Sequence, residues 1–319
     1  MRRVSLGLVL LCLGESATAS PFLTRDQNPL LGGFALPMPL PATPTAPGTS
    51  RLDLIGNWSS TASTGLNNDE ALLVDLESHE LRLVLEHGFA PRYSLRLQVP
   101  YRSLGKGVLD GFIDGWHQAL GLPDGARRFL ERDQYQVGYL RSGRTLLNLY
   151  EPAQGFGDIA IEMGYQTWKN PSSAASLWLT LEAPTGDEKT LLGNGEWDAG
   201  IQIAGHNSVG ARSSLYWQAG ATYLGKGGYL AAWQKQWAAS VAATFEYMVV
   251  PRFNFKVQVD AHSAIYASNL DFLGEAVILT IGGDYRFASG LNFALGIGED
   301  IAVGSSPDVN FYFAVGKTF

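Results

Sequence analysis

The last eleven residues of the chain alternate strictly between two kinds of side chain. The two interleaved sets are Val309, Phe311, Phe313 and Val315, and Asn310, Tyr312, Ala314 and Gly316. A period of two places one set on each face of a β-strand. Because the sequence ends within this strand, we expect it to pair with a strand made earlier, as when the two ends of a sheet close into a barrel. A strand that is apolar outside and polar inside is typical of a membrane barrel.

The first nineteen residues predict a secretory signal peptide. Arg2 and Arg3 precede an apolar stretch, residues 4–13, and the small residues 17–19 offer a cleavage site after Ala19. Cys12, the only cysteine, follows Leu11, where a lipoprotein signal wants a small residue, so we expect no lipidation. The processed chain would then form no disulfide.

Charge and hydropathy exclude two broad classes. The net charge of −7 becomes −8 when residues 1–19, with two arginines and one glutamate, are removed. Such an acidic chain is a poor candidate for binding nucleic acid. After residue 19 no segment approaches the roughly 18 consecutive apolar residues that a spanning helix needs. The mean hydropathy of +0.00 instead suits a barrel with one lipid-facing and one water-facing side.

Residues 20–50 form a proline-rich arm ahead of the barrel, which we assign to residues 51–319. The prolines of the arm are Pro21, Pro29, Pro37, Pro39, Pro41, Pro44 and Pro47. This density forbids a ladder strand or a long helix and favours extended structure. The arm is either a periplasmic lead-in or a plug in the barrel mouth, with apolar anchors at Leu30, Leu31, Phe34 and Leu36.

Alternating segments then recur along the chain and predict an all-β fold, a transmembrane antiparallel barrel of about twelve strands. We expect the strands near 51–59, 70–87, 92–101, 156–168, 175–184, 195–205, 211–224, 236–248, 252–263, 275–287, 290–299 and 308–319. The parity of the apolar positions changes between Leu76 and Leu81, which predicts a bulge near Ser78.

The predicted connections alternate in length along the chain. The long ones are 60–69, 102–155, 185–194, 225–235, 264–274 and 300–307, and the short ones are 88–91, 169–174, 206–210, 249–251 and 288–289. Outer-membrane barrels have short periplasmic turns and longer extracellular loops, so both ends of the barrel segment are expected at the periplasmic side. Aromatic residues near the strand ends predict interfacial girdles: Trp168, Trp197, Tyr223, Trp237, Tyr247, Phe253, Tyr285, Phe287 and Phe319.

The inferred inner, pore-lining face carries more acids than bases. The acids are Glu80, Glu86, Asp158, Glu162, Glu182, Asp198, Glu246, Asp260 and Asp284, and the bases are Arg82, Arg96, Lys256 and Arg286. An open lumen of this kind would favour cations. A filled lumen would turn the same groups into a buried salt-bridge network that conducts nothing. A barrel of about twelve strands fits either alternative.

The connection 102–155 is too long for a plain loop and predicts a helical insertion in one extracellular loop. Its apolar residues at helical spacing are Leu109, Phe112, Ile113, Trp116 and Leu120. This helix would lie on the outer leaflet or cap the barrel mouth. A second short helix is expected near Asp124, and Arg127, Arg128 and Arg132 are either solvated or paired with lipid phosphates.

Signals for catalysis or a metal are weak. His206-Asn207-Ser208 falls near a predicted periplasmic turn, and His262-Ser263 near the outer side has no partner placed by the sequence. Both are better explained as turn or structural residues than as parts of a nucleophilic triad. The histidines lack metal-ligand spacing. We therefore expect no enzyme activity and no cofactor or metal.

Four segments resemble a family of uncharacterised Gram-negative outer-membrane barrel proteins, classed as a domain of unknown function. They are residues 25–30 (RDQNPL), 111–117 (GFIDGWH), 121–125 (GLPDG) and 155–158 (GFGD). The resemblance spans nearly all of the chain after the leader and implies location and fold, but no catalytic residue. One residue departs from the usual pattern: Lys317 stands where an outer-membrane insertion signal has an apolar residue.

Taken together, these features predict a passive channel or transporter for small solutes in the outer membrane. The alternatives are a non-conducting structural or lipopolysaccharide-interacting barrel and, third, an outer-membrane lipid hydrolase. The expected partners are outer-membrane lipid and lipopolysaccharide, and the barrel-assembly machinery during biogenesis. That machinery would read an insertion signal formed by Phe311, Phe313, Val315 and Phe319.

Overall fold

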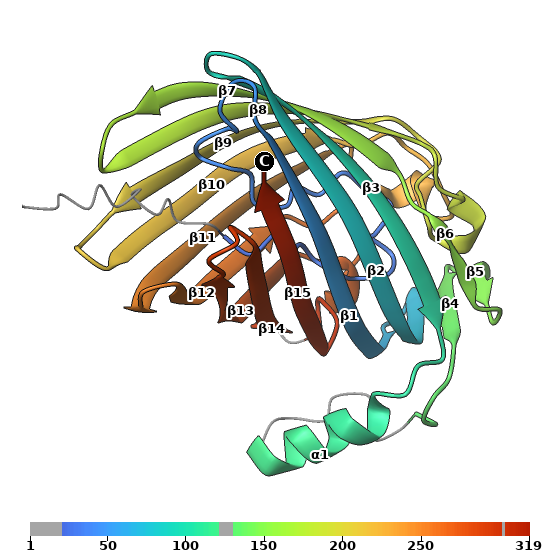
Figure 1. Cartoon of the computed structure of the whole chain (residues 1–319). Coiled ribbons are helices and arrows are strands. Elements are labelled where there is room, and N and C mark those ends of the chain that lie inside the picture. Colours follow the sequence, from blue (N-terminus) through green and yellow to red (C-terminus); the bar gives the residue numbers. More distant parts are fainter. Residues whose placement is uncertain (1–20, 121–129, 302–303) are drawn as a thin grey trace, which may run out of the picture.

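Twelve antiparallel strands close into a barrel in the computed structural model, which describes residues 21–120, 130–301 and 304–319 (Figure 1). The barrel strands are β1 (Ser50–Leu66), β2 (Glu70–Ala90), β3 (Tyr93–Gly105), β7 (Ile159–Lys169), β8 (Ser173–Ala183), β9 (Asp198–Ser208), β10 (Ser213–Tyr223), β11 (Trp237–Val250), β12 (Phe253–His262), β13 (Ala276–Arg286), β14 (Asn292–Asp300) and β15 (Val309–Thr318). The predicted fold class is confirmed.

The closure of the ring is made by the first and last strands. β1 and β15 pair antiparallel without interruption, from Arg51 opposite Thr318 to Ser60 opposite Val309. Phe313 on β15 lies flat over Gly56 on β1, where any Cβ would collide with its ring. Each remaining strand pairs with its neighbours in the ring, and β3 pairs with β7 across the long insertion. The alternating terminal segment therefore closes the sheet, as the sequence predicted.

The connections sort by end, with one exception. Short turns, 91–92, 170–172, 209–212, 251–252 and 287–291, join the strands at the end we call periplasmic. At the extracellular end, longer connections carry the short helices η2 (Glu188–Thr190), η3 (Ala231–Trp233) and η4 (Asp271–Leu273). The prediction of a long connection at 60–69 is wrong. Residues 60–65 are all small, most of them hydroxylated, yet residues 60–66 continue β1 and pair with β2, which leaves a turn of residues 67–69.

The predicted bulge near Ser78 is also wrong. β2 pairs with β1 without any shift of register from Ala71 to His87. In its extracellular half Leu72, Val74 and Leu76 point inward and are buried, whereas Leu81 and the alternate residues after it point outward. The change of parity therefore reflects a change in what the barrel contains, from a polar interior to an apolar core.

The two faces of the barrel differ in character. Outward-pointing side chains such as Leu85, Ile203 and Phe245 form an apolar belt and are 39–43% exposed. All nine aromatic residues assigned to girdles are likewise exposed near strand ends, and among them Tyr223 and Trp237 stack edge to face with centroids 5.4 Å apart. Inward-pointing positions are mostly polar and buried. A single sheet thus separates lipid from a filled interior.

In its described residues, the long connection after β3 holds one helix and three strands. They are α1 (Asp110–Leu120), β4 (Gln136–Arg141), β5 (Arg144–Leu149) and β6 (Ala153–Phe156). β4 extends the sheet beside the extracellular half of β2, and β6 pairs with the end of β3. The sequence predicted the helix but missed the strands. Ser142 and Gly143 form the turn between β4 and β5, and both have positive φ (50° and 73°). A glycine in such a two-residue turn is the sequence feature that could have predicted this hairpin.

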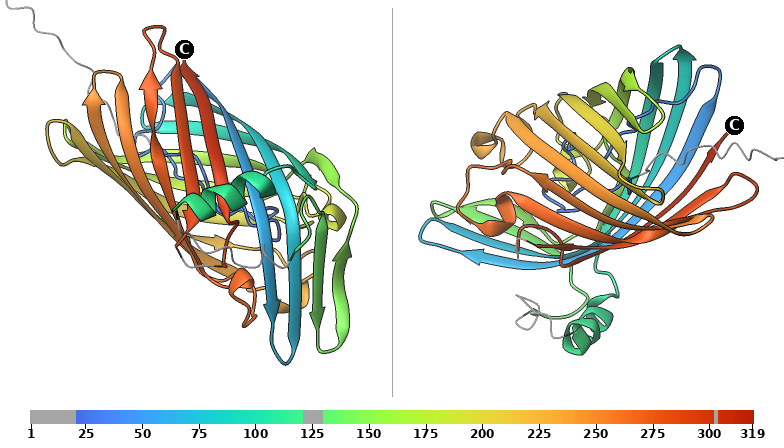
Figure 2. Two further views of the ribbon diagram at one scale, coloured as in Figure 1. Left: turned by 90° about the horizontal axis from the view of Figure 1, so that it is seen from below. Right: turned by 90° about the vertical axis from the view of Figure 1, so that its left-hand side faces the viewer.

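Helix α1 lies outside the barrel, against the outer wall, as both views in Figure 2 show. Leu109, just before the helix, and Ile113 within it are buried and pack on Val309, with Trp58 and Phe311 beside them. The helix begins where the Glu77 carboxylate accepts the backbone N–H groups of residues 108 and 109. Of the two expected placements, the structure excludes the cap over the barrel mouth.

Replacing Leu76 by alanine should lower the free energy of unfolding by about 2–4 kcal/mol, because it opens a cavity in the enclosed core. Leu83→Ala on the same strand faces outward and should change stability much less. Unfolding by guanidinium chloride in detergent micelles measures both. Equal effects would contradict the assignment of these residues to opposite faces.

Candidate functional site

The interior of the barrel is occupied by the N-terminal arm, residues 21–47. Its side chains are almost all buried, and in Figures 1 and 2 its blue trace runs between the walls. From Thr45 at the periplasmic end the arm can be followed to Leu30–Leu36 at the extracellular end and back to Pro21. Thr45 donates its N–H to Glu86 (2.6 Å), and Ala35 donates to Asp198 near the extracellular end (2.9 Å). These contacts are the ones expected if the arm is a plug inside the barrel and not a periplasmic lead-in.

Side-chain amides of the wall hold the backbone of the arm. Gln258 accepts the N–H of Phe22 (2.8 Å) and donates to its carbonyl (3.1 Å). Gln218 accepts the N–H of Leu40 (2.7 Å) and donates to the carbonyl of Met38 (3.2 Å). A buried backbone needs such partners, and the prolines reduce the number of N–H groups that require one. Neither glutamine was predicted as a contact of the arm, because an uncharged side chain on the inner face gives no local signal of its partner.

The first motif of the arm, residues 25–30, leads into the turn at residues 29–33. Arg25 donates to the carbonyls of Gly32 (2.8 Å) and Phe34 (2.7 Å). Asp26 contacts Nε2 of His262 at 2.9 Å, and Asn28 donates to the carbonyl of Phe272 at 2.9 Å. Each polar residue of the motif therefore fixes the arm to itself or to a different part of the barrel.

Glu80 is the centre of the buried charge network. Its carboxylate lies 3.0 Å from Arg82 and 3.8 Å from both Arg102 and Arg25, and each of these side chains is at most 6% exposed. The sequence analysis did not include Arg102, which has the same parity on β3 as Arg96. The network joins the arm to two strands of the wall.

The other predicted inner-face charges mostly meet partners as well. Lys256 lies 2.5 Å from Asp284 and 3.4 Å from Glu246, and Arg96 lies 3.2 Å from Glu162. Asp158 and Asp198 accept backbone N–H groups from the extracellular connections, at Gly186 and Gly225 among others. Asp260 accepts a hydrogen bond from Gln258 (2.8 Å), and Glu182 lies opposite Asp198 in the ladder. Arg286 lies exposed at the periplasmic mouth.

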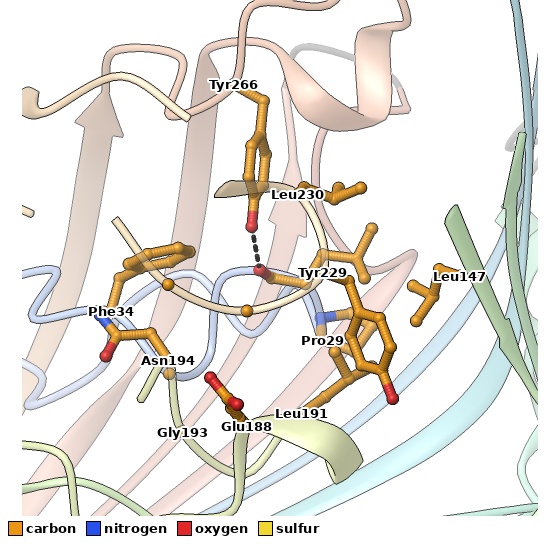
Figure 3. A pocket seen from close by; sticks show the side chains of 14 residues that line it. Pro29, Phe34, Leu147, Glu188, Leu191, Gly193, Asn194, Tyr229, Leu230 and Tyr266 are labelled. Atoms are coloured by element: carbon orange, nitrogen blue, oxygen red, sulfur yellow. Dashed lines mark hydrogen bonds between the residues drawn. The ribbon is translucent and has the colours of Figure 1, made fainter. Parts of the chain in front are cut away.

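An apolar core closes the extracellular end. The predicted anchors Leu30, Leu31, Phe34 and Leu36 pack there with β2, β4, β5 and the outer connections. A small pocket of about 30 Å³ lies among them (Figure 3). At its edge Tyr266 donates to the carbonyl of Leu30 (3.2 Å), as the dashed line shows.

Two tyrosines in these connections remain protonated donors. Burial raises the pKa of Tyr266. Burial, and then the nearby carboxylates of Asp187 and Glu188, raise the pKa of Tyr229. Tyr229 donates to the carbonyl of Lys189 (2.8 Å), so a neutral phenol ties one outer connection to the next.

The periplasmic end of the interior is not closed by an apolar core. A cavity of about 410 Å³ lies between the arm and the wall, and its lining includes Arg51, Glu86, Arg96, Arg286 and Asn292. The interior is therefore closed by an apolar core at its extracellular end and contains a polar cavity at its periplasmic end.

The predicted residues of the long connection do not form one site. Phe112 is exposed and packs edge to face on Phe311 with centroids 5.9 Å apart. Arg132 pairs with Asp114 at 2.6 Å and remains largely exposed. The side chains of Trp116 and Leu120, the expected second helix near Asp124 with Arg127 and Arg128, and the signal peptide all lie outside the described residues.

The histidine candidates have structural surroundings. His206 lies within β9 and not in a turn, and its side chain is buried. Nδ1 of His262 contacts the backbone carbonyl of Ser263 at 3.0 Å, while the Ser263 hydroxyl accepts the N–H of Ala239. This is not the contact of a base with a nucleophile. In the described part of the chain, no group of three or more ligating side chains is placed to hold a metal ion.

Comparisons with known proteins agree on the fold. A family model described as protein of unknown function (DUF3187) matches residues 9–319. Among solved structures, the COG4313 outer membrane channel from Pseudomonas putida F1 aligns over 87% of this chain and 98% of its own, with a TM-score of 0.58 and 14% identity. The KdgM porin aligns over 84% and 99%, with a TM-score of 0.45 and 9% identity.

No curated protein matches the sequence. No helix in the described residues is long and apolar enough to cross a membrane. The likeness to the first of these structures shows the fold, a barrel of the outer-membrane channel type.

Replacing Glu80 by glutamine should destabilise the barrel by about 3–5 kcal/mol, because Arg82 and its neighbours would remain charged and buried without their carboxylate. Asp69→Asn, which breaks an exposed pair with Arg141, should cost at most about 1 kcal/mol. Unfolding midpoints in detergent compare the two variants. A Glu80→Gln protein as stable as Asp69→Asn would show that the network contributes little.

Proposed function

We propose that this chain, which belongs to the DUF3187 family of proteins of unknown function, is an outer-membrane channel for small solutes whose lumen is closed by its own N-terminal arm. The observation that carries the proposal is the way the arm is held. It sits inside a closed barrel with a largely polar wall, and wall side chains supply most of its partners. The arm is thus a separable occupant of a preformed tube.

The strand ladder supports this separation. The ring of twelve strands closes without the arm, through the pairing of β1 with β15. Apart from the isolated bridge between Pro47 and Gly88, where the arm enters, no described residue of the arm pairs with a strand as another strand would. Moving the arm would break side-chain contacts and leave the backbone ladder of the wall intact.

The charge of the wall suggests which solutes would pass. In the described residues, the acids of the inner face include the nine predicted ones, Asp53 and Glu70, and the bases include Arg51 and Arg102 with the four predicted ones. With the arm displaced, this acidic excess would favour cations over anions. The signal peptide and export across the inner membrane form part of the same proposal.

Tethering the arm should abolish conduction, and weakening its hold should increase it. The side-chain oxygens of Thr24 and Asn57 lie 3.3 Å apart, so Thr24→Cys with Asn57→Cys can lock the arm to β1. The double variant Gln218→Ala with Gln258→Ala should raise the open probability several-fold, with cation selectivity. Conductance in planar bilayers at high salt measures both.

The single Asn57→Cys variant and reduction of the disulfide are the controls. Conduction should return to the level of the single variant when the disulfide is reduced. A folded glutamine double variant that shows no conductance steps, and equal currents with the tether formed or reduced, would contradict the channel proposal.

The filled lumen also favours a second candidate, a non-conducting barrel that acts at its outer surface. Helix α1 and the residues leading into it support it, because Phe112 on the helix and Val108 just before it are 53% and 74% exposed beside the lipid-facing wall. On this reading the helix contacts the acyl chains and phosphates of the outer leaflet, with Arg132 at its edge. Lipid and lipopolysaccharide would then be the functional partners.

For this second candidate, Phe112→Asp should increase the permeability of the outer membrane to detergent. Gln118→Asp, also exposed on α1, is the matched control and should have a smaller effect. Dye uptake by cells producing each variant at equal level provides the measurement. Unchanged uptake with Phe112→Asp would remove the support for a surface role.

A further inference from the structure

The first limb of the arm, residues 21–28, is attached to β12 at two points. Gln258 binds the backbone of Phe22, and four residues further along both segments Nε2 of His262 lies 2.9 Å from the carboxylate of Asp26. Both segments run from the periplasmic toward the extracellular end, so the two contacts hold the limb along the strand. Of the two, the second joins side chains that can both carry charge, and it is therefore the one that pH can alter.

Both ring nitrogens of His262 face acceptors. Nε2 contacts the Asp26 carboxylate, and Nδ1 lies 3.0 Å from the carbonyl oxygen of Ser263. A carbonyl oxygen and an ionised carboxylate can only accept, whereas a neutral imidazole has a single N–H. Both contacts are therefore hydrogen bonds only when the ring carries two protons. The arrangement is that of an imidazolium paired with a carboxylate, and the two side chains are 7% and 0% exposed.

Two other charged side chains line a cavity of about 20 Å³ beside this pair, and both have partners of their own. Arg25 donates to carbonyl groups within the arm, at Gly32 among others. Asp260, two residues before His262 on β12, accepts a hydrogen bond from Gln258 (2.8 Å) and acts on the ring through its charge. Neither of them forms an ion pair with the imidazole.

The strands on either side of β12 place uncharged residues beside His262. Its partners in the two ladders are Ser240 on β11 and Ala276 on β13. Asp300 at the end of β14 acts on Asp26 through its charge, but its carboxylate accepts backbone N–H groups of the connection that follows. Among the described residues, Asp26 is therefore the acid that forms an ion pair with the ring.

We propose that His262 and Asp26 form a pH-sensitive latch on the first limb of the arm. When His262 is protonated, a charge-assisted hydrogen bond holds the limb to β12. When the ring loses a proton, the attraction between the two charges is lost, and one ring nitrogen faces an oxygen without a proton between them. A rise in pH therefore loosens the limb, and acid holds it in place.

The position of the latch indicates which compartment it senses. His262 is the last residue of β12 and lies at the extracellular end, so the relevant pH is the one outside the cell. In a channel closed by the arm, acid would favour the closed state and a higher pH would favour opening. This consequence rests on the proposed channel function, whereas the loosening of the limb does not.

Alkylation of a cysteine on the first limb tests the latch in the full chain, purified in detergent. Thr24 is 2% exposed and lies between the two attachment points, so Thr24→Cys reacts with iodoacetamide when the limb moves. Every protein carries Cys12→Ser, which leaves the new thiol as its only one. Dividing the rate by that of the exposed Ala288→Cys at the same pH removes the pH dependence of the thiol itself. This ratio should rise roughly tenfold between about pH 6 and pH 9.

Three further variants identify the titrating group. His262→Gln keeps a polar side chain that does not titrate in this range, so the ratio should no longer change with pH. His87→Gln is the matched control, because this exposed histidine lies at the periplasmic end and contacts Ser50, not the arm. It should keep the full rise. Asp260→Asn should also keep a rise, since Asp260 does not hold the limb.

A second measurement does not depend on the folding of any variant at position 262. In protein labelled at histidine, NMR should show His262 protonated at the pH where the ratio is low and neutral where the ratio reaches its plateau. The inference is overturned if the ring is neutral throughout, or if the ratio does not change with pH. It is also overturned if the rise persists in His262→Gln or disappears in Asp260→Asn.

Alkylation and NMR need no current, so the two proposals fail separately. A limb that loosens with pH in a protein that never conducts would contradict the channel proposal and leave the latch standing. Conduction by the Gln218→Ala and Gln258→Ala double variant, together with a limb that does not respond to pH, would overturn the latch alone.

Discussion

The structure depends on the pairing of β1 with β15. In a lipid environment an unpaired backbone group has no water to replace its partner, so a spanning sheet must have no free edge. The register from Arg51 opposite Thr318 to Ser60 opposite Val309 removes both edges at once. Phe313 covers Gly56 at this seam and fills the space that a side chain at Gly56 would take. All other features of the molecule are arranged inside or outside this ring.

The closed ring inverts the usual relation between surface and core. The outer face is apolar because lipid surrounds it, so the interior can hold polar side chains, provided that each finds a partner. The arm satisfies this requirement with its backbone, and its prolines lower the number of donors that need satisfying. Where the arm turns at the extracellular end, the interior becomes apolar, and Leu72, Val74 and Leu76 of β2 face inward to meet it.

The arm and the wall are joined by interactions of a different kind from those within the wall. Adjacent strands share backbone ladders, whereas the arm is held by pairs of hydrogen bonds from glutamine side chains and by the Glu80 network. This difference lets one part move while the other stays folded. The apolar closure and the periplasmic cavity both lie at surfaces that the arm shares with the wall.

Sequence periodicity was sufficient for the barrel, the order of its strands and the face on which the charged residues lie. Such properties are local, because the alternation of apolar and polar positions along a strand depends only on residues two positions apart. An outward-facing leucine gives the same pattern in any membrane barrel. The helix at 110–120 followed from the same kind of local signal. The strands at 136–156 were missed because they are short and take their stability from pairing with β2 and β3.

Only the tertiary structure decided what fills the barrel. Arg25 and Glu80 lie 55 positions apart in the chain, and no pattern in either segment states that they meet. The parity change in β2 was visible in the sequence, but it was interpreted as a bulge because the inner face was assumed to be polar throughout. Whether an inward residue meets water, an arm or an apolar core depends on contacts between distant segments, and these exist only after the ring has closed.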